Sequence, residues 1–356
     1  MIRHAFVLLV AILVLVATGI ASAGQYCVID PPRAASATGT GFYVARPITQ
    51  RVASSADTSY RLYDPTGTEF RIRGMNTSHP DASGSPAGIG RSGANTARMF
   101  LNFANDPAKN WAIMQAVPNV VFIPTNWSTT CQVDPSYLSK AVDQWVAQAS
   151  TWTQLNSTGL VNIANEWGPS VSNSPTGWRD GYLTAIPRMR AAGYTMTLVI
   201  DAGYCGQDAA TIVKYGQQLL DADPEHNLLF SVHIYGSFHY PATATWMQDY
   251  ATAMSQLKAT GLPILIGEFG PYMSGNSSQT LVPTAKLIGD AEANGWGWMA
   301  WSWDSNNLPN CMADDTSFSA TKKCGIYVTD DDLTLWGKTI VPMFQAMGAR
   351  PANLHP

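Results

Sequence analysis

The sequence predicts a parallel (β/α)₈ barrel, and three observations lead to this fold class. Eight apolar runs of β-type composition recur between residues 70 and 303. Most of them are separated by segments with helical periodicity. The runs read as near-continuous hydrophobic stretches, as expected for strands covered on both faces. A doubly wound open sheet is the rival architecture, but GMNTSH at 74–79 lacks the glycine-rich phosphate turn expected after its first strand.

The predicted elements follow a regular order along the chain. Residues 24–40, rich in Ala, Thr and Pro, predict a flexible lead-in, and residues 41–350 predict a single barrel domain. Residues 60–73, with a turn at 64–67, predict a hairpin that enters the first strand. The expected strands are 70–75, 95–101, 119–124, 160–165, 195–200, 228–235, 263–269 and 296–303. The clearest helices are expected at 135–155, 175–192, 208–221, 243–259 and 278–294.

The first 23 residues have the pattern of a secretory signal peptide. Arg3 and His4 precede an apolar run, and Ala21-Ser22-Ala23 supplies the small residues of a cleavage site. An uncleaved membrane anchor is the alternative, but the run is shorter than the ~20 apolar residues a span requires. We therefore expect a secreted protein, extracellular or periplasmic, without membrane association after the signal is removed.

Export makes disulfide bonds possible among the five cysteines. Cys311 and Cys324 flank one loop and are the first expected pair. Cys131 and Cys205 fall on two predicted loops of one rim and could form a second pair, which leaves Cys27 over. The connectivity stays open at this stage. No Cys or His spacing resembles a zinc site, so we expect neither a metal nor another cofactor.

Composition and charge narrow the classes of partner. The formal net charge is −4, and no run of like charges gives a footprint for nucleic acid or for an anionic membrane. Twelve Trp and fourteen Tyr make a heavy aromatic load. Most of these rings belong to the core, but a surplus suits stacking on the apolar faces of sugar rings. The expected partner is a neutral polymer, bound by a monomer.

Two glutamates end predicted strands of the barrel. Glu166 ends the fourth strand, in LVNIANEWG, and Glu268 ends the seventh, in IGEFG. The chemistry of such barrels lies at the carboxyl ends of the strands, so these side chains can face each other. Cleavage of a glycosidic bond with retention needs two carboxyl groups ~5 Å apart. We assign Glu268 as the nucleophile and Glu166 as the acid.

Further polar residues at strand ends support this interpretation. Arg98 lies within an apolar run and needs an anionic partner, for which we select Glu268. His233 and Tyr235 alternate to the same side of the sixth strand and can orient the carboxylates. Each has a simpler explanation: Arg98 in a rim ion pair, His233 as a core histidine. Asp201 ends the fifth strand, and its simpler explanation is that it caps the helix that begins near residue 208.

Taken together, these residues resemble glycoside hydrolase family five. The resemblance is closest to its bacterial endo-β-1,4-mannanase branch and covers most of 60–345, with ANEWG (164–168), TLVIDAGYCGQ (197–207), FSVHIYG (230–236), IGEFG (266–270) and WMAWSWDSN (298–306). It implies an acid/base role for Glu166, a nucleophilic role for Glu268 and contact of Asn165 with the sugar 2-hydroxyl. It also implies substrate contact for His79 and a sugar platform at Trp301.

One departure from the family pattern bears on specificity. The family usually places a His just after strand three, where this chain has Asn126 and Trp127, and we include Trp127 among the expected substrate-binding residues. The substrate is then mannan, glucomannan or cellulose. An endo-β-1,4-glucanase is the alternative enzyme. A non-catalytic carbohydrate-binding barrel is the third hypothesis, but it would not require both Glu166 and Glu268.

Overall fold

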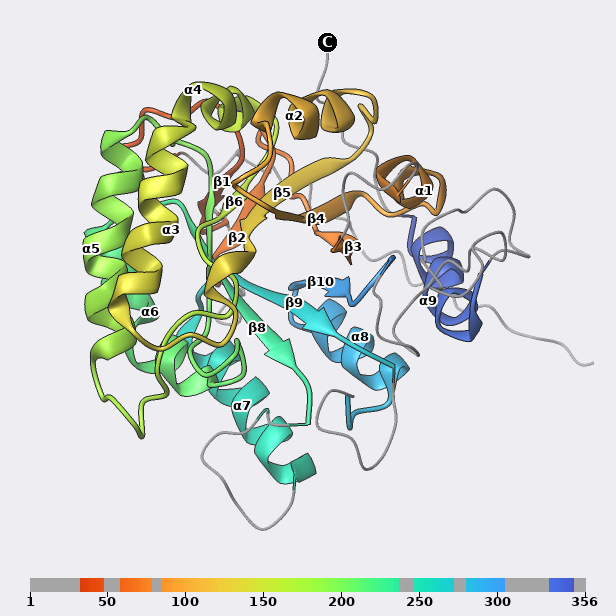
Figure 1. Ribbon diagram of the computed structural model, residues 1–356. Helices are drawn as coiled ribbons and strands as arrows, with labels where there is room; N and C mark the ends of the chain where they lie inside the picture. Colours follow the sequence, from red (N-terminus) through yellow and green to blue (C-terminus); the bar gives the residue numbers. More distant parts are fainter. Residues whose placement is uncertain are drawn as a thin grey trace, which may run out of the picture.

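The computed structural model describes most of the chain and contains the expected barrel. The described residues are 33–47, 58–78, 85–236, 238, 246–271, 280–304 and 333–348. Eight parallel strands close in the order β10-β3-β4-β5-β6-β7-β8-β9 (Figure 1). The strands are β3 (Arg73–Thr77), β4 (Thr96–Leu101), β5 (Val121–Asn126), β6 (Val161–Asn162), β7 (Leu198–Asp201), β8 (Leu228–Ile234), β9 (Ile264–Phe269) and β10 (Gly297–Ala300). The predicted fold class is confirmed.

Helices surround the barrel and bury one face against it. In α3, Leu138, Ala141, Val142 and Trp145 are buried, which is the i, i+3, i+4, i+7 spacing of an amphipathic helix. Helices α3, α5 and α6 pack consecutively along one flank (Figure 1). The helices are α1 (Ser85–Arg91), α2 (Pro107–Gln115), α3 (Pro135–Ala147), α4 (Ala149–Trp152), α5 (Gly177–Ala191), α6 (Ala209–Ala222), α7 (Trp246–Thr260), α8 (Thr284–Ala293) and α9 (Leu335–Ala346), with 3₁₀ turns η1 (Trp127–Thr129) and η2 (Thr153–Ser157).

The predicted helix 135–155 is divided in the structure. Helix α3 ends at Ala147, and α4 and η2 follow as short turns. The sequence here is rich in Ser and Thr, whose hydroxyls compete for backbone groups, and Thr153 Oγ1 donates to the Ala149 carbonyl at 2.7 Å. After α3 the chain therefore continues as two short helical segments, α4 and η2, which lead it toward β6.

The N-terminal hairpin is built differently from the prediction. Asp64 accepts at its side chain from Thr66 N, and Gly67 N donates to the Asp64 carbonyl, so the expected turn is present. Strand β2 (Arg61–Tyr63), however, pairs with the preceding β1 (Tyr43–Ala45). The segment after the turn adds only a bridge at Glu69, because the chain then leaves to enter the barrel as β3.

A buried asparagine attaches the N-terminal segment to the barrel. Asn227 Oδ1 accepts from Val44 N at 3.1 Å and from Thr197 Oγ1 at 2.8 Å, and its Nδ2 donates to the Phe42 carbonyl at 2.9 Å. All four residues are buried. A single amide side chain thus pairs the buried Val44 amide and, together with Thr197, the Phe42 carbonyl.

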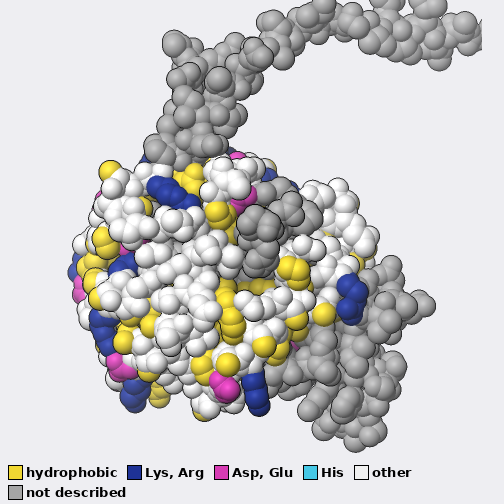
Figure 2. Space-filling model, turned by 90° about the horizontal axis from the view of Figure 1, so that it is seen from above, with side chains coloured by type: hydrophobic (Ala, Val, Ile, Leu, Met, Phe, Trp, Pro, Cys, Tyr) yellow, Lys and Arg dark blue, Asp and Glu magenta, His cyan; other side chains and the backbone are white. Residues whose placement is uncertain are grey.

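The outer surface carries dispersed charges. On the face seen in Figure 2, the blue and magenta side chains of the described residues lie around the periphery and do not gather into a patch of one sign. Within the described part of the chain, none of the helices is both long and apolar enough to cross a lipid bilayer.

Replacing Asn227 by alanine tests the attachment of the N-terminal segment. The change leaves the Val44 amide unpaired, whereas the Phe42 carbonyl keeps the Thr197 hydroxyl as a donor at 3.1 Å. One unpaired buried group costs roughly 1–3 kcal/mol, so we expect the free energy of unfolding to fall by about that amount. Urea denaturation measures the loss. Asn173→Ala, at an exposed position, is the matched control. Equal stability of the two variants would contradict the assignment.

Candidate active site

The polar residues predicted at the strand ends meet at the carboxyl end of the barrel. Arg98 lies on β4, Asp201 ends β7, His233 lies on β8 and Glu268 on β9. Glu166 follows β6 and comes within hydrogen-bonding distance of His233. Parallel strands in a closed barrel bring all of these ends to one rim, which is why residues distant in sequence form one cluster.

Glu268 is held at both carboxylate oxygens. Arg98 Nη1 donates to its Oε1 at 2.6 Å, and the Tyr235 hydroxyl donates to its Oε2 at 2.9 Å. The selected pairing of Arg98 with Glu268 is confirmed. Burial raises the pKa of Tyr235 well above its usual value, and the Glu268 charge adds to this effect, so the phenol remains a donor. The orientation of the Glu268 carboxylate is therefore fixed by two strands.

Arg98 is a fully buried hub and not part of a rim ion pair. Its Nη1 also donates to Asn76 Oδ1 at 3.0 Å. Its Nη2 donates to Asn165 Oδ1 at 2.6 Å and to Asp201 Oδ2 at 3.1 Å. A guanidinium is costly to bury unless it is paired and hydrogen-bonded. Here the charge is offset by two carboxylates and oriented by neutral amides.

Asp201 is a site residue that the sequence analysis did not identify. Its carboxylate accepts from the backbone N–H of Glu166 at 3.0 Å and from Asn162 Nδ2 at 3.1 Å, in addition to Arg98. It does not cap α6, whose N-cap is Asp208. Burial alone would raise the pKa of Asp201, but the charges of Arg98 and His233 lower it overall. Its position at a strand end was the signal that could have found it.

The backbone turns sharply at Glu166. The residue has φ 54°, in the left-handed region that side chains other than glycine seldom adopt. The N–H bond to Asp201 holds this conformation. Strand β6 covers only Val161–Asn162, shorter than the predicted 160–165 strand. The Glu166 side chain turns to the barrel centre, where it meets His233. Backbone strain of this kind is concentrated at functional sites.

Burial and neighbouring charges shift the pKa values of Glu166 and His233. Burial raises the pKa of Glu166 to about 6; the His233 hydrogen bond opposes this and the Glu268 charge reinforces it. Burial lowers the pKa of His233, but the charges of Glu268 and Asp201 outweigh that effect and raise it to about 10. His233 is therefore an imidazolium at neutral pH and donates from Nδ1 to Glu166 Oε1 at 2.9 Å. Its Nε2 lies 3.7 Å from Asp201 Oδ2, a charge contact too long for a hydrogen bond.

The two carboxyl groups have the separation that retention requires. One carboxylate oxygen of Glu166, one of Glu268 and a ring nitrogen of His233 all lie within 4.8 Å of one another. This agrees with the roughly 5–5.5 Å between an acid and a nucleophile that act on the same anomeric carbon. The same three groups, two carboxylate oxygens and one ring nitrogen, are close enough to hold a metal ion when that nitrogen is unprotonated.

A row of aromatic rings extends from the charged cluster. The Phe100 ring lies 5.2 Å from that of Trp127 and 5.1 Å from that of Trp301, and the Arg98 guanidinium stands 4.9 Å over it. Trp127 is 49% exposed, whereas Phe100 is buried. A pocket of about 440 Å³ beside this row is lined by Ser78, Phe100, Leu101, Asn102, Phe103, Asn126, Trp127, Ser128 and Gln144. The row is suited to stacking against sugar rings.

Asn126 replaces the expected histidine after the third strand and has a structural role. Its Oδ1 accepts from Ser128 N at 3.0 Å as the cap of η1, and its Nδ2 donates to Gln144 Oε1 at 2.8 Å. Trp127 follows as the exposed ring of the aromatic row. His79, the other predicted contact, lies outside the described residues.

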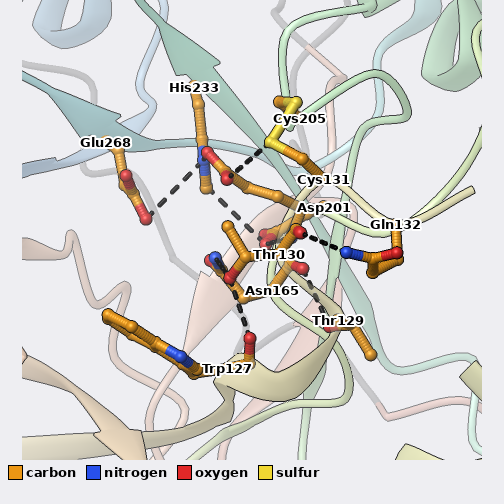
Figure 3. The surroundings of a disulfide bond; sticks show 11 residues. Trp127, Thr129, Thr130, Cys131, Gln132, Asn165, Asp201, Cys205, His233 and Glu268 are labelled. Carbon is orange, nitrogen blue, oxygen red and sulfur yellow. Dashed lines mark hydrogen bonds and ion pairs between the residues drawn. A yellow bond between two sulfur atoms is a disulfide. The ribbon is translucent and has the colours of Figure 1, made fainter. Parts of the chain in front are cut away.

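A disulfide bond joins two loops of the same rim. Cys131, after η1, is bonded to Cys205, after β7 (Figure 3). This confirms the second expected pair. Cys311, Cys324 and Cys27 lie outside the described residues, so the other expected pairing stays a prediction.

Comparison with known proteins agrees with this geometry. A model of the family Cellulase (glycosyl hydrolase family 5) matches residues 138–307. The mannan endo-1,4-beta-mannosidase of Salipaludibacillus agaradhaerens is 32% identical over 294 residues, which cover 79% of this chain and 88% of that protein. The structure of β-mannanase from Streptomyces thermolilacinus with mannohexaose is 30% identical, with a TM-score of 0.64 over 81% of this chain and 92% of that one. The mannohexaose complex of Thermomonospora fusca β-mannanase is 26% identical, with a TM-score of 0.67 over 83% and 97%.

A glycine-to-alanine pair tests the packing around His233. Gly206 has φ +73°, and a Cβ there would lie 2.6 Å from the His233 ring, so Gly206→Ala should displace the ring and reduce activity at least tenfold, about 1.4 kcal/mol in the barrier. Gly289→Ala, in α8 with open space around it, should leave activity unchanged and stabilise by roughly 0.5–1 kcal/mol. Steady-state kinetics and thermal denaturation distinguish the two. Equal activity of both variants would refute the contact.

Proposed function

The chain belongs to glycosyl hydrolase family 5 and is a glycoside hydrolase; on this premise we propose that it cleaves internal β-1,4 linkages of mannan and glucomannan with retention of configuration. The observation that carries the proposal is the pair of carboxyl groups of Glu166 and Glu268. One oxygen of each and a ring nitrogen of His233 all lie within 4.8 Å of one another. The names of the relatives, mannan endo-1,4-beta-mannosidase and β-mannanase, support the substrate class.

The proposed first step uses Glu268 as nucleophile and Glu166 as acid. Arg98 and Tyr235 hold the Glu268 carboxylate in one orientation, and its oxygen attacks the anomeric carbon. Burial raises the pKa of Glu166 to about 6, so the side chain is mostly protonated below that pH and partly protonated near neutrality, and the protonated form gives its proton to the departing glycosidic oxygen. The products of this step are a glycosyl ester on Glu268 and a shortened polymer end.

In the proposed second step the same groups release the sugar. Glu166, now ionised, takes a proton from a water molecule, and the water oxygen attacks the anomeric carbon from the side that the leaving group vacated. The His233 imidazolium stabilises the Glu166 carboxylate during this interval through its 2.9 Å hydrogen bond. Glu268 leaves as a carboxylate, and Arg98 stabilises its returning charge.

Substrate contacts are proposed for Asn165 and the aromatic row. Arg98 holds Asn165 through Oδ1, and Thr130 accepts one of the two Nδ2 protons, so the amide is rigidly placed to donate its second proton to the sugar 2-hydroxyl. Trp301 and Trp127 are proposed to stack on successive sugar rings. His79 remains a proposed contact from the resemblance.

An endo-β-1,4-glucanase is the second candidate. Stacking on Trp127 and Trp301 tolerates either epimer, and the Asn126 side chain is engaged with Ser128 and Gln144. Discrimination at the 2-hydroxyl therefore depends on few polar groups. We also propose secretion after removal of residues 1–23, on the basis of their sequence pattern.

A substrate panel separates the candidates. We expect purified mature protein to release reducing sugars from galactomannan and glucomannan at rates at least tenfold higher than from carboxymethylcellulose, because a misplaced 2-hydroxyl leaves polar groups unpaired. Proton NMR of the first products should show the β-anomer, as retention requires. Preferred hydrolysis of carboxymethylcellulose would favour the glucanase, and an initial α-anomer would exclude the mechanism.

Substitution of the two glutamates tests their roles. Glu268→Ala should abolish turnover of every substrate, a loss of at least about 10⁴-fold, because no nucleophile remains. Glu166→Ala should lose polymer hydrolysis but retain formation of the glycosyl ester from aryl mannooligosaccharides, whose good leaving group needs no acid. Release of the aryl group in a pre-steady-state burst measures this step. If Glu166→Ala lost as much activity on aryl mannooligosaccharides as on polymer, the assignment of Glu166 as the acid would be wrong.

The pH dependence follows from the raised pKa of Glu166. The protonated form is the active acid, so kcat/KM on polymer should decline as pH rises through about 6, with a tenfold loss per unit above it. The measurement is a pH profile of kcat/KM at constant ionic strength. A plateau that extends beyond pH 8 would show that Glu166 does not supply the proton.

A further inference from the structure

The disulfide bond lies against the Glu166 side chain and not at a distance from the site. Cys131 Sγ is 3.5 Å from Glu166 Oε2, and His233 Nδ1 is 2.9 Å from Oε1. A sulfur atom within a disulfide carries no hydrogen, so it cannot donate to Oε2. The two oxygens of one carboxyl group therefore have different environments: Oε1 faces a cation, and Oε2 faces the sulfur bridge.

The bridge also joins the two loops that enclose the backbone of the Glu166 segment. On one side, Gly168 N donates to the Gln132 carbonyl at 2.9 Å, one residue after Cys131. On the other side, Tyr204 N donates to the Gly168 carbonyl at 2.8 Å, one residue before Cys205. The segment that follows Glu166 is thus hydrogen-bonded to both loops, and the disulfide ties these loops to each other.

The backbone at this junction is unusually constrained. Cys131, Glu166, Tyr204 and Cys205 all have φ between 53° and 55°. Left-handed conformations are uncommon for residues other than glycine and persist where the surrounding structure determines them. Cys205 also precedes Gly206, whose carbonyl accepts from His233 N at 2.8 Å. The bridge therefore connects to both partners of the Glu166–His233 hydrogen bond.

We propose that the Cys131–Cys205 disulfide is a positioning element for the acid/base step: it fixes Glu166 between two loops and covers one side of Oε2 with sulfur that cannot donate a hydrogen bond, so that Oε2, whose other side is left for the substrate and the attacking water, carries the proton delivered to the leaving group. This inference rests on the proposed role of Glu166. It assigns the transferable proton to one oxygen, since Oε1 is occupied by the His233 N–H.

The titratable and charged neighbours of Glu166 lie on elements other than the two bridged loops. They are His233 and the neutral Tyr235 from the β8 side, Glu268 on β9 and Asp201 on β7, with Arg98 behind them on β4. The sulfur atoms cover one side of Oε2, with Cys131 Sγ at 3.5 Å and Cys131 itself exposed at the rim. Their loss admits water to Oε2, which stabilises the carboxylate form and lowers the pKa of Glu166.

The test compares two double variants with a loop control. Cys131→Ala/Cys205→Ala opens Oε2 to water, and Cys131→Ser/Cys205→Ser adds a hydroxyl donor. Val133→Ala, exposed in the same loop, is the control. We expect the alkaline limb of kcat/KM to move to lower pH by roughly half to one unit with alanine and further with serine, since hydration and hydrogen bonding favour the ionised carboxyl. The acidic limb and the Val133→Ala profile should match the parent.

A purely structural disulfide would give a different result. It would lower the melting temperature or the amplitude of the profile while the alkaline limb stays in place, and that outcome overturns the proposal. Aryl mannooligosaccharides with a good leaving group give a second readout, because their first step should be less affected than polymer hydrolysis. Equal losses on both substrates would also count against positioning of the acid.

Reduction of the parent protein covers the case in which the double variants do not fold. Dithiothreitol transfers two electrons to the bridge, gives two thiols and is itself oxidised to a cyclic disulfide; intact-mass analysis after alkylation verifies the reaction. The Cys131 thiol then offers Oε2 a donor, so the alkaline limb should move to lower pH, and an unchanged limb overturns the proposal. Full polymer activity of Glu166→Gln would instead refute the proposed function, whatever the bridge does.

Discussion

The buried guanidinium of Arg98 is the interaction on which the site depends. It connects β4 to Glu268 on β9 and to Asp201 on β7, and through Asn165 it reaches the segment after β6. A buried cation cannot be left unpaired, so these strand ends must converge on it wherever else their sequences vary. Glu268, the Asn165 amide and Asp201, which supports Glu166, all take their positions from one side chain.

The balance of charges in the buried cluster explains why the pKa of Glu166 is raised. Arg98 and His233 supply two positive charges, and Asp201 and Glu268 supply two negative ones, so the buried cluster is neutral without a charge on Glu166. Ionisation of Glu166 would add a negative charge to a buried site. Because burial disfavours the charged form, the pKa of Glu166 is raised. The charge of the third carboxylate, Asp201, contributes to the raised pKa of Glu166.

The sequence was sufficient for the fold and for the central pairings, because strand order in a parallel barrel places strand ends at one rim. The pairing of Arg98 with Glu268 followed from the cost of a buried cation. Asp201 was missed since a carboxylate before a helix has an ordinary explanation as a cap, and only the structure shows that Asp208 has that role. The left-handed turn at Glu166 and the contact of the disulfide with its carboxyl group could not be predicted, because both depend on packing between loops distant in sequence.

Phe100 links two parts of the molecule. The Arg98 guanidinium lies over its ring, which packs against Trp127 in a T-shaped contact and against Trp301 in a tilted one. The charged cluster belongs to the strands, whereas Trp127 belongs to a loop that begins with Asn126. A change of Trp127 in that loop can therefore alter the aromatic row and the adjacent pocket while the charged cluster keeps its geometry, because the Trp127 ring meets the cluster through the Phe100 ring.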